Sequence, residues 1–522
     1  MVSKLAVARA AHIAAGWCVL LSIGCGESPS TGVAPNLGPP GVRIVSGANV
    51  SDTATYIIPQ PLVVEVRDDD GRLAVGTWVH FEVRGHGDAT RPNESRLGLC
   101  TRPLNQCSFG FSAATLATAK TDSAGRASTY VQLGQVAGTA VVSIYAPEFG
   151  RPDSATFQVQ PGPANRLRLV STDTVLNIGT TANLRARVVD RFNNVRAELP
   201  VMSVSAGAAI TLDAATGLTT ARELGTQWVI ARHGAFVDST RVRAVPAGRL
   251  LVWSPSSESV RLVNINGTDT RTIMNSVKAS PGTVPVFSAT RHRVSFRHGY
   301  YDDCCTPNSV VVVDTTGFAR RDVDPTFGFL PLTTRQVADG SVLIVGARNN
   351  TTGLWRFAAD STITLLASLP GGVAGFGAAD ISHDGTRVAY AVRMGTRLEL
   401  RIFAVATNSF TVLEQNATSP RWSRQGDRVA FFVPESATSA DYTKGYPAVV
   451  NADGSGRRVF NTTVWQFGIG WSPDGSYLIG RKDSLTEREL QVLRVSDGIF
   501  VSLTFRGPAG NSVENYQQPD WR

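Results

Sequence analysis

The sequence is poor in charge and in long apolar runs. Only 18% of its 522 residues are charged, against about 25% in an average soluble protein. This composition excludes a coiled coil, and because no stretch of eighteen apolar residues occurs after residue 24, a polytopic membrane protein is excluded as well. The 50 lysines and arginines are scattered with no run of five, and we therefore predict no nucleic-acid partner.

Residue patterns typical of catalytic or metal-binding sites are also scarce. The seven histidines lie far apart and show no zinc-type pairing. The segment Gly470-Trp471-Ser472-Pro473-Asp474 resembles the start of a nucleophile elbow, but it lacks the final glycine and no strand-to-helix turn follows it. We predict a protein that is not an enzyme, with no catalytic residue, no metal ligand and no cofactor.

Turn-forming and apolar residues are plentiful instead. The chain has 49 glycines, 27 prolines and 43% hydrophobic residues. Short alternating runs separated by turn signals predict an all-β protein, specifically two β-sandwiches followed by a propeller of repeated sheets.

The N-terminal segment is typical of an exported protein. Residues 1–24 contain two basic residues and an apolar stretch from Ala10 to Leu21. The following Leu21-Ser22-Ile23-Gly24-Cys25 resembles a bacterial lipoprotein processing site, although Ser22 stands where that family has leucine. The resemblance implies cleavage before Cys25 and acylation of its thiol; the alternative is an ordinary secretory signal peptide.

Residues 25–40 read as a lipidated flexible tether. The segment from Gly26 to Pro40 is rich in glycine, proline and serine and has little to bury. The tri-acylated terminus that the lipoprotein resemblance implies would hold stably to a membrane. Gly26, in place of aspartate, fits sorting to the bacterial outer membrane, on its periplasmic or its cell-surface face.

Residues 41–160 are predicted to form the first sandwich. Two alternating runs, 62–67 and 77–83, flank Asp68-Asp69-Asp70-Gly71, which predicts a hairpin. The three carboxylates could also ligate calcium, but turn chemistry alone explains them. With the later segments Thr121–Ala127 and Gly138–Ile144, the motifs resemble bacterial immunoglobulin-like (Big) domains of the invasin/intimin type. A weaker version of the pattern predicts a second, shorter domain over 163–246.

The cysteines predict two disulfides in an oxidising compartment. Cys100 and Cys107 flank a short loop and are well placed to pair. Cys304 and Cys305 are adjacent, and we predict a vicinal bridge between them. A metal site beside Asp302 and Asp303, or pairing between chains, are the alternatives.

The remaining chain repeats a strand, a tight turn and an apolar strand. Equivalent positions fall at residues 288, 337, 382, 423 and 472, spaced by 41 to 49 residues, a period that suits a four-stranded propeller blade. Residues 248–253 read as the second strand of a blade, and the last five residues read as a first strand. We predict that the final strand pairs beside Leu250–Trp253 and completes a sixth blade. Over 248–522 these repeats resemble the six-bladed propeller of TolB-type proteins, although the α/β domain of TolB is absent.

The first strand of each blade should line a central channel. The residues just before its aromatic position are Val286, Arg335, Asp380, Arg421, Gly470 and Asp520. Of these, Arg335, Asp380, Arg421 and Asp520 could converge to hold a polar ligand or a loop of a partner; alternatively, they pair with one another. The recurring Trp422, Trp471 and Trp521 are expected to pack between blades, although a stacking platform for sugars is the other interpretation.

These features predict a cell-envelope lipoprotein that binds, adheres or scaffolds through its propeller face, with the sandwiches as a stalk. The expected partners are the membrane, through the lipid anchor, and an envelope protein or glycan. The alternative is a glycan-binding accessory protein that assists polysaccharide breakdown or uptake.

Overall fold

A computed structural model describes residues 37–84, 96–108, 114–171, 174–277, 285–288, 290–298, 309–323, 329–360, 362–375, 378–436, 443–461, 463–484, 489–505 and 516–522. In this part of the chain the regular structure is strand, apart from one short 3₁₀ helix at Leu104–Gln106, which confirms the all-β fold. No helix in these ranges is long and apolar enough to cross a membrane. The signal peptide, the tether with Cys25, and the pair Cys304 and Cys305 lie outside the described residues.

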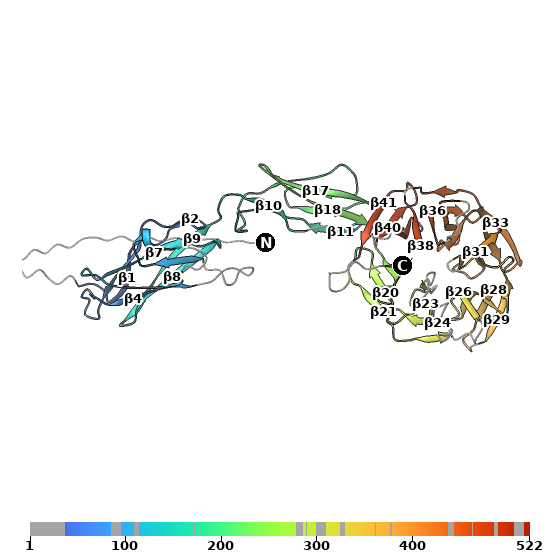
Figure 1. Cartoon of the computed structure of the whole chain (residues 1–522), viewed down its shortest axis with the longest axis horizontal. Helices are drawn as coiled ribbons and strands as arrows, with labels where there is room; N and C mark the ends of the chain where they lie inside the picture. The colour runs from blue at the N-terminus through green and yellow to red at the C-terminus, as the bar shows by residue number, and fades with distance from the viewer. Residues whose placement is uncertain are drawn as a thin grey trace, which may run out of the picture. The chain divides into compact units, whose positions relative to one another are not determined.

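The chain divides into two compact units between Gly162 and Pro163 (Figure 1). The first unit contains two sheets with alternating buried residues, as in β3 and β8. One has the order β1 (Gly41–Ser46), β3 (Leu62–Arg67), β7 (Arg126–Leu133), β5 (Leu97–Cys100). The other has the order β2 (Ser51–Thr53), β9 (Phe149–Gln160), β8 (Gly138–Ala146), β4 (Trp78–Arg84), β6 (Leu116–Lys120).

The hairpin predicted around the three aspartates is wrong. The tight turn itself is present, because the Gly71 N–H donates to the Asp68 carbonyl at 3.0 Å and Arg67 bridges Leu73. However, β3 pairs with β1 and β7, whereas β4 pairs with β6 and β8. The segment between the turn and Trp78 is long enough to carry the chain to the other sheet, which a two-residue loop could not do.

A disulfide joins Cys100 at the end of β5 to Cys107, with Cα atoms 5.9 Å apart. The 3₁₀ helix lies between the two cysteines. The cross-link therefore closes a short excursion of the chain next to an edge strand of the first sheet.

Residues 163–246 form the first part of the second unit. Its sheets are β10 (Arg166–Leu169) with β13 (Ala186–Val189); β11 (Thr174–Asn177), β18 (Phe236–Val245), β17 (Gly225–His233), β14 (Val201–Val204); and β12 (Thr181–Asn183), β16 (Leu218–Ala221), β15 (Ile210–Leu212). Fully buried side chains from several of these strands, among them Val188, Val229 and Val242, make one core.

Residues 249–522 form a ring of antiparallel sheets around a common centre (Figure 1). We call this part the ring. Its sheets, each written from the inner strand outward, are β42 (Gln517–Trp521), β19 (Arg249–Ser254), β20 (Ser259–Asn264), β21 (Arg271–Met274); β22 (Val286–Phe287), β23 (Arg293–His298), β24 (Ser309–Asp314), β25 (Arg321–Val323); β26 (Phe329–Gln336), β27 (Val342–Arg348), β28 (Thr351–Phe357), β29 (Ile363–Ser368); and β30 (Ala379–Ile381), β31 (Arg387–Met394), β32 (Arg397–Ala404), β33 (Ser409–Gln415). A larger sheet follows, with β34 (Thr418–Trp422), β35 (Arg428–Val433), β36 (Lys444–Asn451), β37 (Arg458–Val459), β38 (Trp465–Trp471), β39 (Tyr477–Lys482), β40 (Glu489–Arg494) and β41 (Phe500–Thr504).

The last strand closes the ring as the sequence predicts. β42 pairs antiparallel with β19, with Trp521 opposite Leu250 and Asp520 opposite Leu251. Gly248 (φ +151°) allows this close approach, because a Cβ there would lie 2.1 Å from Trp521 Nε1. This pairing gives the exposed edge of β19 a partner.

The ring and residues 163–246 share a core. Leu224 and Val245 belong to the same buried cluster as Leu250 and Ile479. At its border, Arg494 Nη1 lies 2.8 Å from Glu223 Oε2. Although the sequence separates these segments at residues 246–248, contacts across that boundary hold them in one unit.

Candidate binding site at the centre of the ring

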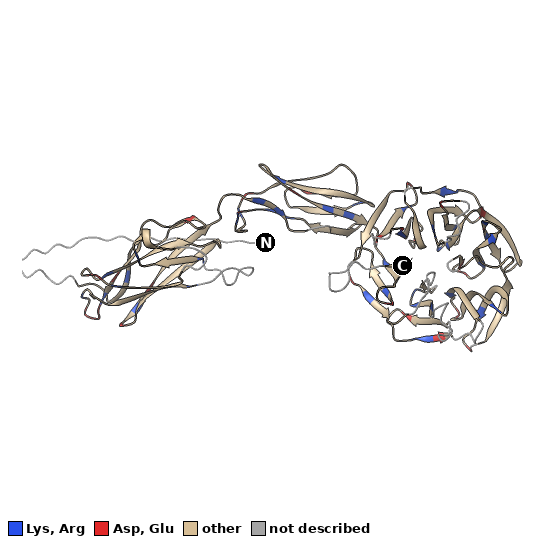
Figure 2. Cartoon of the chain, in the orientation of Figure 1, with Lys and Arg blue, Asp and Glu red and all other residues tan. Residues whose placement is uncertain are grey.

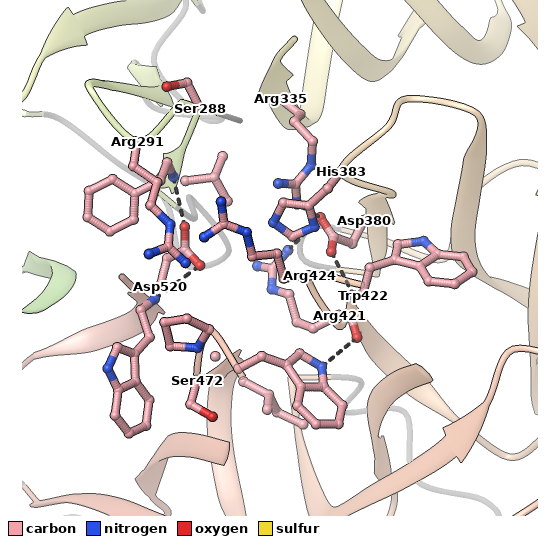
Figure 3. A pocket seen from close by; sticks show the side chains of 17 residues that line it. Ser288, Arg291, Arg335, Asp380, His383, Arg421, Trp422, Arg424, Ser472 and Asp520 are labelled. Atoms are coloured by element: carbon pink, nitrogen blue, oxygen red, sulfur yellow. Dashed lines mark hydrogen bonds and ion pairs between the residues drawn. The ribbon is translucent and has the colours of Figure 1, made fainter. Parts of the chain in front are cut away.

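The residues before the aromatic positions of the first strands line a single pocket (Figure 3). They come from β22, β26, β30, β34, β38 and β42, which are distant in sequence, and are Val286, Arg335, Asp380, Arg421, Gly470 and Asp520. The structure thus brings together all four residues predicted as ligand-binding. The cavity volume is about 30 Å³.

Three of these four residues, Arg335, Asp380 and Arg421, are held in place by contacts with one another. Arg335 Nη2 and Arg421 Nη1 lie 3.0 and 3.5 Å from Asp380 Oδ1, and all three side chains are buried. Arg335 Nε also donates to the Ile381 carbonyl at 2.7 Å, and the Trp422 N–H donates to Asp380 Oδ2 at 2.9 Å. Asp380 therefore ties its own sheet to both neighbouring sheets.

The electrostatics of this group follow from burial and pairing. Burial alone would raise the pKa of Asp380, but the charges of Arg335 and Arg421 outweigh it and hold the pKa below its ordinary value. Burial lowers the pKa of the Arg421 guanidinium, and the charges of Asp380 and Asp520 offset this lowering only in part. Asp380 is therefore a fixed carboxylate and a poor proton carrier.

Asp520 occupies the equivalent position in the closing strand. Its Oδ2 accepts the Phe287 N–H at 2.7 Å, the same contact that Asp380 makes with Trp422. Burial raises the pKa of Asp520, and the hydrogen bond and the charges of Arg335 and Arg421 counter this only in part. No ion pair joins Asp520 to another residue that the structure describes.

Three pocket residues were missed by the sequence analysis: Arg291, His383 and Arg424. They lie in the tight turns that follow the inner strands, one to three residues after Ser288, Ser382 and Ser423. A signal was present in the repeats, because Arg291 stands where the four other turns have glycine, at positions 340, 385, 426 and 475. Channel residues were sought only on the strands, so these turn residues were not considered.

The tryptophans pack between sheets, as expected from core packing. Trp422, Trp471 and Trp521 are 2%, 6% and 4% exposed. Arg387 covers Trp422 and Arg428 covers Trp471, with ring-centroid distances of 4.5 and 5.0 Å. All three rings are buried and two of them are covered by guanidinium groups, so they offer no open face on which a sugar could stack.

The hydroxyl groups in the pocket are occupied in turn hydrogen bonds. Ser472 Oγ donates to Asp474 Oδ1 at 2.6 Å and accepts the Tyr477 N–H at 2.9 Å. Ser288 Oγ accepts the Arg293 N–H at 3.2 Å. Both hydroxyl groups therefore hold the tight turns in which they lie.

Burial, together with the charge of Arg335, lowers the pKa of His383 to about 3, against the smaller opposing effect of the Asp380 charge. Between pH 3 and 6.5 the folded state therefore binds fewer protons at His383 than the unfolded state does. The contribution of His383 to the free energy of unfolding is complete above pH 6.5 and is lost as the pH falls towards 3. From pH 6.5 to about pH 5 we expect a loss of about 2 kcal/mol from this residue. His383→Gln should remove that part of the pH dependence in urea unfolding, while His292→Gln, at an exposed site, should keep it.

Comparison with known proteins finds only distant similarity. No protein-family model matches the sequence, and no curated protein matches it. Among solved structures, TolB from Acinetobacter baumannii is 12% identical, with 60% of this chain and 81% of that chain covered and a TM-score of 0.43. A putative TolB from Agrobacterium tumefaciens is 12% identical, covering 49% and 88% of the two chains with a TM-score of 0.35.

Proposed function

We propose that the ring is a six-bladed β-propeller of the TolB type, and that residues 41–160 and 163–246 are immunoglobulin-like sandwiches of the invasin/intimin type. Support comes from the repeated four-strand order around the ring and from the pairing of β42 with β19. In the proposed sandwiches, strands distant in sequence pair within separate sheets: β3 pairs with β7 and β4 with β8 in residues 41–160, and β11 pairs with β18 in residues 163–246.

On this architecture, the protein is a non-enzymatic binding protein of the cell envelope. The ring face presents its central pocket to a partner, and the sandwiches act as a stalk. The observation that carries the proposal is the convergence of six inner strands on one pocket whose buried polar groups are fixed by hydrogen bonds between sheets. Such a site is preorganised for recognition. An envelope protein is the favoured partner over a glycan, because the ring tryptophans are covered.

A photo-crosslinker at Thr290, an exposed residue beside the pocket, tests this function in intact cells. We expect one envelope protein to be captured, and the product to disappear when Arg424→Glu is added. The same crosslinker at Phe318, which is 89% exposed on another part of the ring, is the control. Equal capture at both positions, or binding on a glycan array without a protein partner, would contradict the proposal.

The lipid anchor is proposed from the sequence around Cys25, with the bacterial outer membrane as the location. Acylation requires the thiol, so metabolic labelling with a palmitate analogue should mark the wild-type protein and leave Cys25→Ser unlabelled. Cys18→Ser is the matched control, since residue 18 lies within the proposed signal peptide. Label retained by Cys25→Ser would favour an ordinary secretory signal. Protease treatment of intact cells then distinguishes the two membrane faces.

A further inference from the structure

The pocket at the centre of the ring has more positive than negative charge. The ionisable side chains that line it are Arg291, Arg335, Arg421, Arg424, Asp380, Asp520 and His383. With the histidine neutral, four cations face two carboxylates. A narrow site with low-dielectric walls and a surplus of one sign concentrates counter-ions of the other.

The surplus resides in two residues. Arg335 and Arg421 both face Asp380. The guanidinium groups of Arg291 and Arg424 make no hydrogen bond or ion pair with any residue that the structure describes, and both line the pocket (Figure 3). Arg291 is half-buried, whereas Arg424 lies at the exposed mouth. Burial lowers the pKa of Arg291, and the charge of Arg424 lowers it further, while the charge of Asp520 raises it only in part. An anion between the two would relieve that repulsion.

The backbone at Arg291 points to a role for its side chain. Its φ is +60°, in the left-handed region that costs an ordinary residue about 1–2 kcal/mol. Gly385, Gly426 and Gly475 hold the same place in the equivalent turns, with φ between +70° and +74°. The turn hydrogen bond is the same, since the N–H of Arg291 donates to the Ser288 carbonyl at 2.9 Å. Glycine would adopt this φ without that cost, so the arginine is an outlier among these turns and points to a role for its side chain.

Two further buried polar atoms, both on ionisable side chains of the pocket, make no hydrogen bond with a described residue. Arg421 Nη1, although 3.5 Å from Asp380, makes no hydrogen bond, and neither does His383 Nδ1, among the described residues. Buried polar groups in folded proteins are almost always satisfied. Both atoms belong to residues of the pocket, so one bound group could satisfy both.

We propose that the central cavity binds one small monovalent anion, the size of chloride or of a single carboxylate group, held by Arg291 and Arg424. The cavity volume of about 30 Å³ admits roughly one or two water-sized groups, which suits an anion of that size. The site goes beyond the proposed envelope function and does not depend on the identity of the partner.

Thermal unfolding of the full chain tests the site. Sodium gluconate, whose anion is too large, is replaced by sodium chloride or sodium formate at constant ionic strength. We expect the midpoint to rise by about 2–4 °C with the anion that fits. Arg291→Gly should fold with an unchanged circular-dichroism spectrum and lose the response, and Arg424→Gln should weaken formate binding, followed by saturation-transfer NMR, at least about tenfold.

The matched control is Asn408→Gly. Asn408 has φ +48° in the turn between β32 and β33, so this variant relaxes a left-handed residue without changing the pocket, and it should keep the full response. A response to chloride alone identifies an inorganic-anion site, and a response to formate identifies a carboxylate site. Equal midpoints in all three salts, or a response retained by Arg291→Gly, would overturn the proposal.

Discussion

Asp380→Ala is expected to destabilise the ring by about 3–5 kcal/mol, because it leaves buried charges without their counter-ion. The side chain of Asp380 is 2% exposed and faces Arg335 and Arg421, which are 4% and 8% exposed. The substitution also removes the acceptor of the Trp422 N–H. Two neighbouring sheets therefore lose their link at once. Urea unfolding of the full chain, followed by tryptophan fluorescence, measures the loss.

Asp322→Ala is the control for that experiment. Asp322 forms two hydrogen bonds with Arg320, but both side chains are nearly half exposed. An ion pair in water contributes about 0–1 kcal/mol, so we expect a correspondingly small change. If the two alanine variants were equally stable, Asp380 would not be the electrostatic link between the sheets.

Trp521→Ala is expected to cost about 3–5 kcal/mol, the range for truncating a large buried aromatic residue. Trp521 is 4% exposed, and its side chain packs in the cluster that also contains Leu250 and Val245. The loss should therefore weaken both the closing strand and the core shared with residues 163–246. In calorimetry, we expect the transition of the second unit to move to lower temperature.

Trp228→Ala provides a matched comparison in the same unit, since Trp228 on β17 is 47% exposed. Its removal should change stability by less than about 1 kcal/mol. A Trp521→Ala protein with an unchanged transition would mean that β42 is not needed to hold the ring together.

Charge placement shows the difference between local and tertiary information. The charged residues lie dispersed along the strands (Figure 2), in keeping with the scatter visible in the sequence. The concentration of charge at the pocket arises only because inner strands and turns from separate repeats meet there. No segment of the chain is basic enough to indicate it.

The sequence alone determined the strand content, the repeat and the pairing of the last strand beside Leu250. These features depend on local patterns: alternation with period two, tight turns, and two incomplete ends that complement each other. The same spacing identified Arg335, Asp380, Arg421 and Asp520 as residues that face one axis, since equivalent places in equivalent strands point in the same direction.

Tertiary structure decided what those residues contact. Three outcomes depend on distances between segments that lie far apart in sequence. They are whether Asp380 pairs with arginines or faces solvent, whether β3 and β4 share a sheet, and whether residues 163–246 join the ring. The pattern in a strand specifies which face is buried but leaves open which neighbour covers it. The turn residues Arg291 and Arg424 became part of the site only when the ring brought their turns to its centre.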